Sequence, residues 1–302
     1  MAFTAQDVKT LREKTGCGMM DCKKALTQAN GDMDAAIDFL REQGLAKQAK
    51  KASRIAAEGV AYACTNDTNT EGVVIEVNAE TDFVAKNDSF QAFVKTCADT
   101  VTAQNPADVD VLLALKAEGS EMTVAELLQE KVLTIGENIK IRRFDKVSSP
   151  CVAYVHAGGK IGVLVTFETD LADKPEFVAY GKDLAMQIAA LNTPYLNKES
   201  VPADVLEHEK KIMTELVMNE GKPAAIAEKI VMGKIGKYYK ENCLLDQEFV
   251  KDNKMNIQQY TDATAKSLGG SIKVTGFIRY EKGEGLEKRQ DDFAAEVASM
   301  VK

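Results

Sequence analysis

Apolar residues in the first forty positions recur at helical spacing, and two breaks that contain Gly16 and Gly31 interrupt them. The pattern predicts three short helices, the third of them capped by the side chain of Asp32. An alanine- and lysine-rich segment over residues 45–57 is expected to follow as a helical connector with one basic side. Residues 1–54 are therefore predicted to form a small helical module and its connector.

Further along, the apolar pattern changes to runs of β-branched residues that are typical of strands. Residues 59–65 and 72–78 flank a polar turn and predict one hairpin, and residues 152–156 and 161–167 predict a second. Each hairpin is followed by an acidic loop, a helix and one more strand, so this part of the chain is an internal repeat. The helices are expected at 89–104 and 177–192, the helix before the first closing strand at 124–135, and the closing strands at 138–144 and 271–277. The sequence thus predicts an α+β protein with two tandem ββαβ subdomains, at 55–147 and at 148–199 with 244–280.

The second repeat carries an insertion that the first lacks, predicted as a helical hairpin at 200–243. Its two amphipathic helices, residues 202–219 and 223–242, are expected to face one another. The apolar residues predicted at their contact are Leu206, Ile212, Met213, Leu216, Val217, Ile226, Ile230, Ile235 and Tyr239. Two helices cannot bury both faces against each other, so the hairpin should project and use its tip or outer face for contact. A short amphipathic helix around Phe293 is predicted within a C-terminal module at 281–302.

The composition narrows the classes of protein to which this chain can belong. Hydrophobic residues make up 45% and charged residues 28%, which is ordinary for a globular protein. No apolar run approaches the roughly 18 residues that cross a bilayer, and the start lacks the apolar core of a secretory signal. We therefore expect a cytoplasmic protein with no membrane contact. The formal net charge of −8 argues against a direct grip on nucleic acid and favours a protein partner.

Residues that carry chemistry are few and scattered. The six cysteines form no C-x-x-C pair, and the two histidines, His156 and His208, are too few for a histidine-based metal centre. The chain also lacks a phosphate-binding G-x-x-x-x-G-K-[ST] loop and a G-x-S-x-G elbow. We therefore predict no metal, no cofactor and no catalytic chemistry of its own.

The acidic loops of the two repeats correspond to each other, as Glu80-Thr81-Asp82 and Glu168-Thr169-Asp170. Their carboxylates are compatible with paired acid–base work, but Thr and Asp after a strand also shape loops and cap helices. Phe83 follows the first acidic triplet, where the second repeat has Leu171. The aromatic ring either folds back onto the sheet or points outward as an anchor for a protein partner.

Several motifs, in order along nearly the whole chain, resemble those of the elongation factor Ts family. The most specific is TDFVAKN, which begins at Thr81. The others are TGCGMMDCKKAL, NGDMDAAIDFLR, IGENIKIRRF, HAGGKIGVLV, GKPAAIAEKI, VTGFIRYEKGEGLEK and DFAAEVASM. The resemblance implies an N-terminal module of the ubiquitin-associated type, a core of two related subdomains, an inserted helical hairpin (coiled coil) and a C-terminal module.

The resemblance also implies a function, guanine-nucleotide exchange on elongation factor Tu during translation elongation. In this family the N-terminal module and first subdomain approach the nucleotide-binding domain of the GTPase, and the second subdomain and C-terminal module contact another domain. Asp82 and Phe83 would intrude beside the helices that flank the nucleotide and disturb its Mg²⁺ and phosphate contacts. The residues assigned to the partner are Thr81, Asp82, Phe83 and Val84, with His156, Gly159, Met19 and Met20 as secondary contacts.

The expected partner is elongation factor Tu in its GDP-bound and nucleotide-free forms, and a homodimer through the helical hairpin, or a complex of two copies with two partner molecules, fits the pattern. Two alternatives stay open. A protein-binding scaffold without exchange activity would bind its partner without sensitivity to GDP. An acid–base enzyme using Glu80 and Asp82 would need a pocket that joins the two acidic loops, which separate tandem subdomains disfavour.

Overall fold

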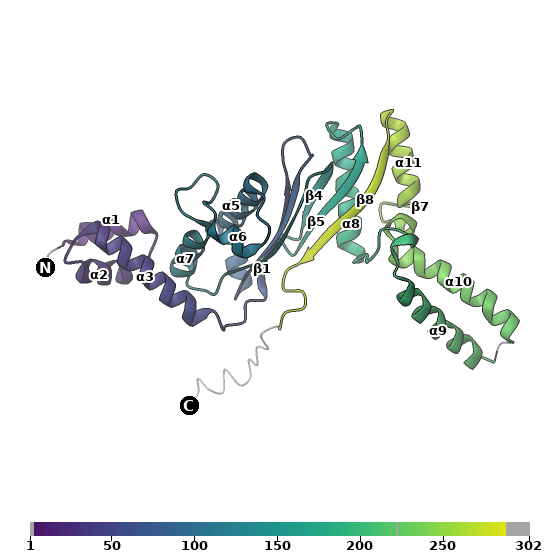
Figure 1. Cartoon of the computed structure of the whole chain (residues 1–302), viewed down its shortest axis with the longest axis horizontal. Helices are drawn as coiled ribbons and strands as arrows, with labels where there is room; N and C mark the ends of the chain where they lie inside the picture. Colours follow the sequence, from purple (N-terminus) through teal and green to yellow (C-terminus); the bar gives the residue numbers. More distant parts are fainter. Residues whose placement is uncertain (1–2, 222, 288–302) are drawn as a thin grey trace.

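The computed structural model describes residues 3–221 and 223–287. Over these residues the chain forms eleven α-helices and three small antiparallel sheets, which confirms the predicted α+β class. The molecule is elongated: a helical module lies at one end, the sheets lie in the middle, and a helical hairpin projects at the other end (Figure 1). The predicted C-terminal helix around Phe293 lies outside the described residues.

The N-terminal module consists of α1 (Ala5–Thr15), α2 (Met19–Gln28) and α3 (Met33–Lys51). A capping box between Thr4 and Asp7 starts α1, and Gly16 ends it with a φ of 67°. The helical connector predicted at residues 45–57 is helical only as far as Lys51, as a continuation of α3, and no helix follows before the first strand. Gly44 does not interrupt α3; a side chain there would meet the main chain of Gln129 at van der Waals distance.

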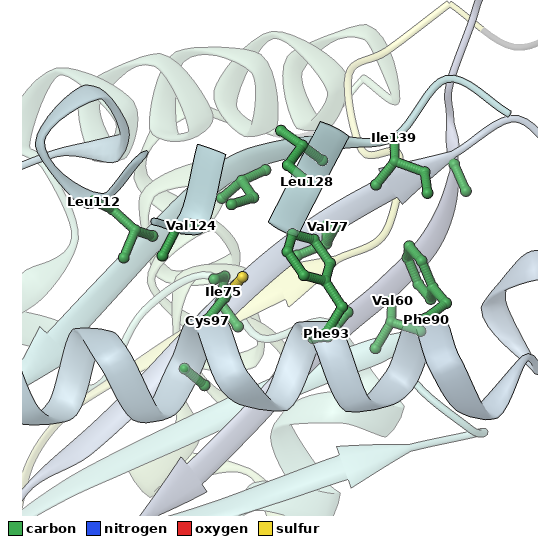
Figure 2. Close-up of a cluster of buried hydrophobic side chains, with 14 of the residues drawn as sticks. Val60, Ile75, Val77, Phe90, Phe93, Cys97, Leu112, Val124, Leu128 and Ile139 are labelled. Atoms are coloured by element: carbon green, nitrogen blue, oxygen red, sulfur yellow. The ribbon is translucent and has the colours of Figure 1, made fainter. Parts of the chain in front are cut away.

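The first core subdomain folds a three-stranded sheet, in the order β1-β2-β3, under a layer of helices. Its elements are β1 (Glu58–Thr65), β2 (Gly72–Ala79), α4 (Asp82–Ala85), α5 (Asp88–Gln104), α6 (Val109–Ala114), α7 (Val124–Ile135) and β3 (Lys140–Val147). Figure 2 shows Phe93 and Cys97 of α5 directed toward Ile75 and Val77 of the sheet. The predicted hairpin, α5 and α7 are confirmed, whereas α4 and α6 were not predicted because neither spans two full helical turns.

The second core subdomain repeats this arrangement with a sheet in the order β4-β5-β8. Its elements are β4 (Cys151–His156), β5 (Ile161–Thr169), α8 (Pro175–Leu191), β6 (Glu248–Phe249), β7 (Asp252–Asn256), α11 (Ile257–Leu268) and β8 (Ile272–Glu281). Phe167, Phe177 and Tyr180 form the aromatic centre of its core. The short β6–β7 pair and α11 were not predicted. A capping box between Asn256 and Gln259 starts α11, and Gly269 ends it with a φ of 71°.

The two sheets pack face to face, so the prediction of separate tandem subdomains is wrong. Residues of both sheets, among them Ala61, Val74 and Leu164, share one buried cluster. The sheets approach so closely at Gly72 that a Cβ atom there would lie 2.6 Å from Cδ1 of Leu164. The result is a four-layer sandwich, with α5 and α7 outside the first sheet and α8 and α11 outside the second.

The corresponding strands of the two stacked sheets run in opposite directions, and this separates the two acidic loops. The tip of the second hairpin meets the start of β1, where the Ala61 N–H donates to the Gly159 carbonyl at 2.8 Å. The tip of the first hairpin meets the loop after β5, where Asn69 Nδ2 donates to the Ala172 carbonyl at 3.3 Å. The loop at Glu80 and the loop at Glu168 therefore lie at opposite ends of the sandwich and share no pocket.

The inserted hairpin consists of α9 (Ala203–Asn219) and α10 (Ala224–Asn242), close to the predicted ranges. Its buried contact contains Val217, Ala227, Val231 and Ile235. The prediction that Ile212, Leu216 and Ile226 also face the opposite helix is wrong, because all three are exposed. The predicted set spread over a wider arc than one helix contact can cover. No helix in the described part of the chain is long and apolar enough to cross a membrane.

Candidate functional site

The segment after β2 forms a short helix, α4, that presents its first residues to solvent. Thr81 precedes it in an extended conformation, with φ −127° and ψ 156°. Val84 and Ala85 are buried against the first core subdomain, and the Asn87 side chain caps the following helix α5 by accepting from the Ser89 amide. The two ends of the segment are thus fixed, and Asp82 and Phe83 lie between them.

Glu137, just before β3, holds the front of this segment. Its carboxylate accepts from the main-chain amides of Glu80 and Thr81 at 3.1 and 3.0 Å, and from the Thr81 hydroxyl at 2.7 Å. In return, the Glu80 carboxylate accepts from the Asn138 amide at 2.6 Å and pairs with Arg54 at 3.3 Å. Thr81 is therefore bound inward. The sequence analysis missed Glu137; its only signal was an acidic residue directly before a predicted strand.

Phe83 points outward, which settles the alternative that the sequence left open. Its side chain is 79% exposed, while Leu171 at the matching position of the second repeat is only 3% exposed. Lys86 pairs with Asp82 at 3.0 Å and its Nζ lies 6.0 Å from the centroid of the Phe83 ring. The hydrogen bond from Lys86 holds the pKa of Asp82 below its usual value, so the carboxylate is ionised at neutral pH. The ring is therefore exposed and flanked by the two charges of this ion pair.

Phe83 borders an open cleft of about 560 Å³ between the N-terminal module and the core. Its lining also includes Glu130, Lys131 and Thr134 of α7 and Gly16 of the turn after α1. On the module, Met19 and Met20 begin α2 just after that turn and are 52% and 73% exposed. Exposed apolar side chains around a hollow are typical of a protein-binding surface.

Val84 differs from its neighbours, because it is only 8% exposed and packs into the core below the cleft. It anchors α4 and presents little surface to a partner. His156 and Gly159 lie at the second hairpin tip, where Tyr154 and His156 Nδ1 share a hydrogen bond of 3.0 Å. Gly159 is buried, and a Cβ atom there would lie 2.7 Å from Val60. It lines a different hollow from Phe83, beside β1 and α5.

Groups that could perform covalent chemistry do not gather at this site. Among the residues that the structure describes, no three His, Cys, Asp or Glu side chains lie together as a metal site would require. The six cysteines are free, and burial raises the pKa of the Cys64 thiol to about 11. Such a thiol is protonated at neutral pH and is a poor nucleophile. The arrangement around Phe83 is suited to binding a macromolecule.

Comparison with known protein families identifies a match to this chain. The model described as Elongation factor TS matches residues 80–284. The matched range begins at Glu80, three residues before Phe83. It includes most elements of the core, the helical hairpin and β8, while the N-terminal module precedes it. Because the match extends over more than half of the residues, the chain belongs to the elongation factor Ts family.

Proposed function

We propose that this protein releases GDP from elongation factor Tu by inserting Phe83 beside the nucleotide site of that GTPase. Members of the elongation factor Ts family are nucleotide exchange factors in translation elongation, not enzymes with covalent chemistry of their own. The observation that carries the wedge is the 79% exposure of Phe83 on a helix whose following residues are buried. The aromatic ring is held in place by the buried residues that follow it, and most of its surface is free to contact a partner.

The roles within the segment differ. Phe83 is the wedge, and Asp82 is its ionised companion, which repels phosphate oxygens and competes for the contacts around Mg²⁺. Thr81 shapes the loop through Glu137, and Val84 holds α4 to the core. The protein needs no cofactor for this action, because it only has to disturb contacts that the partner makes with its own ligand.

Exchange of this kind is a coupling between two ligands of one GTPase. A factor that binds the nucleotide-free form more tightly weakens nucleotide binding, and by linkage the nucleotide weakens the factor equally. A thousandfold faster release needs a barrier lowered by about 4 kcal/mol. Burying one phenylalanine side chain contributes roughly 1.5–3 kcal/mol. Phe83 therefore supplies a large part of the effect, and the oriented body behind it supplies the remainder.

Other surfaces extend the proposed complex. The three-helix module, which we infer to be of the ubiquitin-associated type, adds the exposed Met19 and Met20 at the start of α2. His156 and Gly159 provide a secondary contact at the second hairpin tip, and the second subdomain and C-terminal module contact another domain of the partner. We place this activity in the cytoplasm, with translation, and without direct contact to nucleic acid.

The outer face of the helical hairpin fits a second copy of this chain, and hence a homodimer or a complex of two copies with two partner molecules. A hollow of about 760 Å³ lies along α9 and α10, with Met218 and Met232 at its border. These two methionines are 54% and 72% exposed. Sedimentation of the protein alone would test this part, since a Met232→Glu variant should be monomeric at concentrations where the parent chain dimerises.

The experiment that tests the main proposal mixes the protein with elongation factor Tu, with and without excess GDP, and measures size and mass. We expect a stable complex in the absence of nucleotide that GDP disperses. A complex that persists unchanged in excess GDP would instead support a scaffold that binds the GTPase without promoting exchange. The same measurement gives the stoichiometry.

A further inference from the structure

A single carboxylate lies buried in the middle strand of the first sheet. Glu76 of β2 is 0% exposed, and its neighbours along the strand are apolar. A charged group in this position is costly unless it is paired and hydrogen-bonded. Burial raises the pKa of Glu76, but hydrogen bonds led by those from Asn78 and the Gly283 amide outweigh it, and the net pKa lies below its usual value. The carboxylate is therefore ionised inside the protein.

The donors to Glu76 come from distant parts of the chain. Arg142 Nη1 and Arg143 Nε of β3 lie 3.0 and 2.7 Å from its two oxygens. The main-chain N–H of Gly283, two residues after β8, donates to the same carboxylate at 2.8 Å. Both arginines also reach the next residue of that turn: Arg142 Nη2 donates to the Glu284 carbonyl at 2.7 Å, and Arg143 lies 3.4 Å from the Glu284 carboxylate. Glu76 thus binds the turn directly and through two arginines.

The turn at residues 282–285 is closely seated. Gly283 has a φ of 69°, and a Cβ atom on it would lie 2.1 Å from the Ala57 carbonyl oxygen, so only glycine fits. Lys282 pairs with Glu58 at the start of β1, and its amide donates to the Lys160 carbonyl at 2.9 Å. We call Glu76, Arg142, Arg143 and this turn the Glu76 clasp.

The clasp lies at the same end of the sandwich as the exposed Phe83. The charge of Lys282 contributes to the lowered pKa of Asp82, which places the turn within electrostatic reach of the wedge segment. Strand β1, whose first residue Glu58 pairs with Lys282, also contacts α4. The point where the chain leaves β8 toward its C-terminal residues is therefore held next to the proposed partner surface.

We propose that Glu76 is a positioning residue for partner binding: it holds the turn at 282–285 in place and so fixes where the C-terminal segment departs from the fold, beside the wedge. This inference rests on the proposed function, in which that segment is a further contact with elongation factor Tu. Two contacts joined at a fixed separation bind as one ligand, whereas a loosened joint loses effective concentration and pre-organisation. The clasp acts on affinity, and Phe83 acts on the release step.

Two variants loosen the clasp by independent routes. Glu76→Gln keeps the size of the side chain and removes its charge, which leaves both arginines without their buried partner. Gly283→Ala leaves every charge in place and displaces the turn through the contact with Ala57. The matched control is Glu168→Gln, which removes a carboxylate from the exposed pair with Lys273, 2.9 Å apart on the second sheet. Exposed pairs of this kind contribute little, so this variant should resemble the parent chain.

The first measurement is hydrogen exchange of single amides in the full-length protein. In both clasp variants, protection of the Gly283 amide should fall about tenfold, because its acceptor loses its negative charge in Glu76→Gln and the amide is displaced from it in Gly283→Ala. Amides in the middle of β5 should remain protected, which shows that the sandwich is folded. Unchanged protection at Gly283 in a folded variant would overturn the clasp, and if Glu76→Gln does not fold, Gly283→Ala decides.

The second measurement separates affinity from rate. We expect the dissociation constant for nucleotide-free elongation factor Tu to rise about tenfold in both clasp variants, while GDP release at saturating factor stays within twofold of the parent rate. An unchanged dissociation constant together with lost protection would show that the clasp has only a local structural role, and a slowed saturated rate would show that it acts on the wedge; either result refutes the proposal. Failure of the wedge itself would appear separately, as an unaffected release rate in Phe83→Ala.

Discussion

Replacing Phe83 by alanine tests the wedge with little risk to the fold. The ring is 79% exposed, so its removal takes almost no buried surface from the free protein, and the free energy of unfolding should change by less than about 0.5 kcal/mol. When the ring is buried against the partner, it contributes roughly 1.5–3 kcal/mol. Losing that contribution only in the transition state for release slows the reaction by about 10- to 150-fold, since 1.36 kcal/mol is a factor of ten.

The assay is stopped-flow release of fluorescent GDP from elongation factor Tu at increasing concentrations of the factor. The maximal rate at saturation reports on the wedge, and the concentration at half saturation reports on the remaining contacts. Phe83→Leu is the matched control, because leucine occupies the corresponding position of the second repeat as Leu171. It retains most of the apolar surface and should slow release only a few-fold.

A folded Phe83→Ala protein that releases GDP at the parent rate would refute the wedge. Thermal unfolding of the variant, measured beside the parent chain, shows whether slower GDP release is instead caused by loss of folded protein. Equal loss in the alanine and leucine variants would show that the aromatic face of the ring matters beyond its buried area.

Three further predictions follow from the surroundings of the site. Glu137→Ala removes the acceptor of the Glu80 and Thr81 amides, so we expect faster hydrogen exchange at both amides and slower GDP release. Leu133 of α7 is 9% exposed within the core of the N-terminal module, and Leu133→Ala should destabilise docking of that module by about 2 kcal/mol, seen as selective loss of protection in α1–α3. Because the folded-state pKa of Glu76 lies below 4.5, its contribution to stability is present above that pH and is lost as pH falls through the folded value. Acid titration of unfolding should therefore be shallower in Glu76→Gln than in the parent chain, and equal slopes would contradict the assignment.

Elements with several full periods of apolar residues were predictable from the sequence. The bounds of α7 match the expected 124–135, and both hairpins lie within one residue or two of their predicted ranges. Short elements such as α4 contain too few residues to show a helical period of apolar positions. Helix α11 was not recognised as an element separate from the insertion that precedes it. The stacking of the sheets did leave a signal: β5 begins with an unbroken apolar run at residues 161–165 instead of alternating, which is typical of a strand covered on both sides.

The site was predictable in part. The aromatic residue at Phe83 stood out because its repeat partner is Leu171, but spacing alone did not show whether the ring faces solvent. That direction depends on Glu137, which is 54 positions away in sequence and fixes the segment by hydrogen bonds. Likewise, Glu76 was a single charged residue in a mostly apolar strand. Its role was not predictable, because its partners Arg142 and Gly283 approach it only in the folded chain.

The face-to-face stacking of the two sheets has a consequence for how the duplicated halves can change over time. Each half supplies one wall of the shared apolar cluster, so a substitution at Val74 or Leu164 is felt by both copies. The buried residues of one copy therefore cannot change, and neither copy can be replaced or lost, without affecting the other. The duplication therefore produced one cooperative unit whose ends were free to diverge, and Phe83 and Leu171, at opposite ends of that unit, record the divergence.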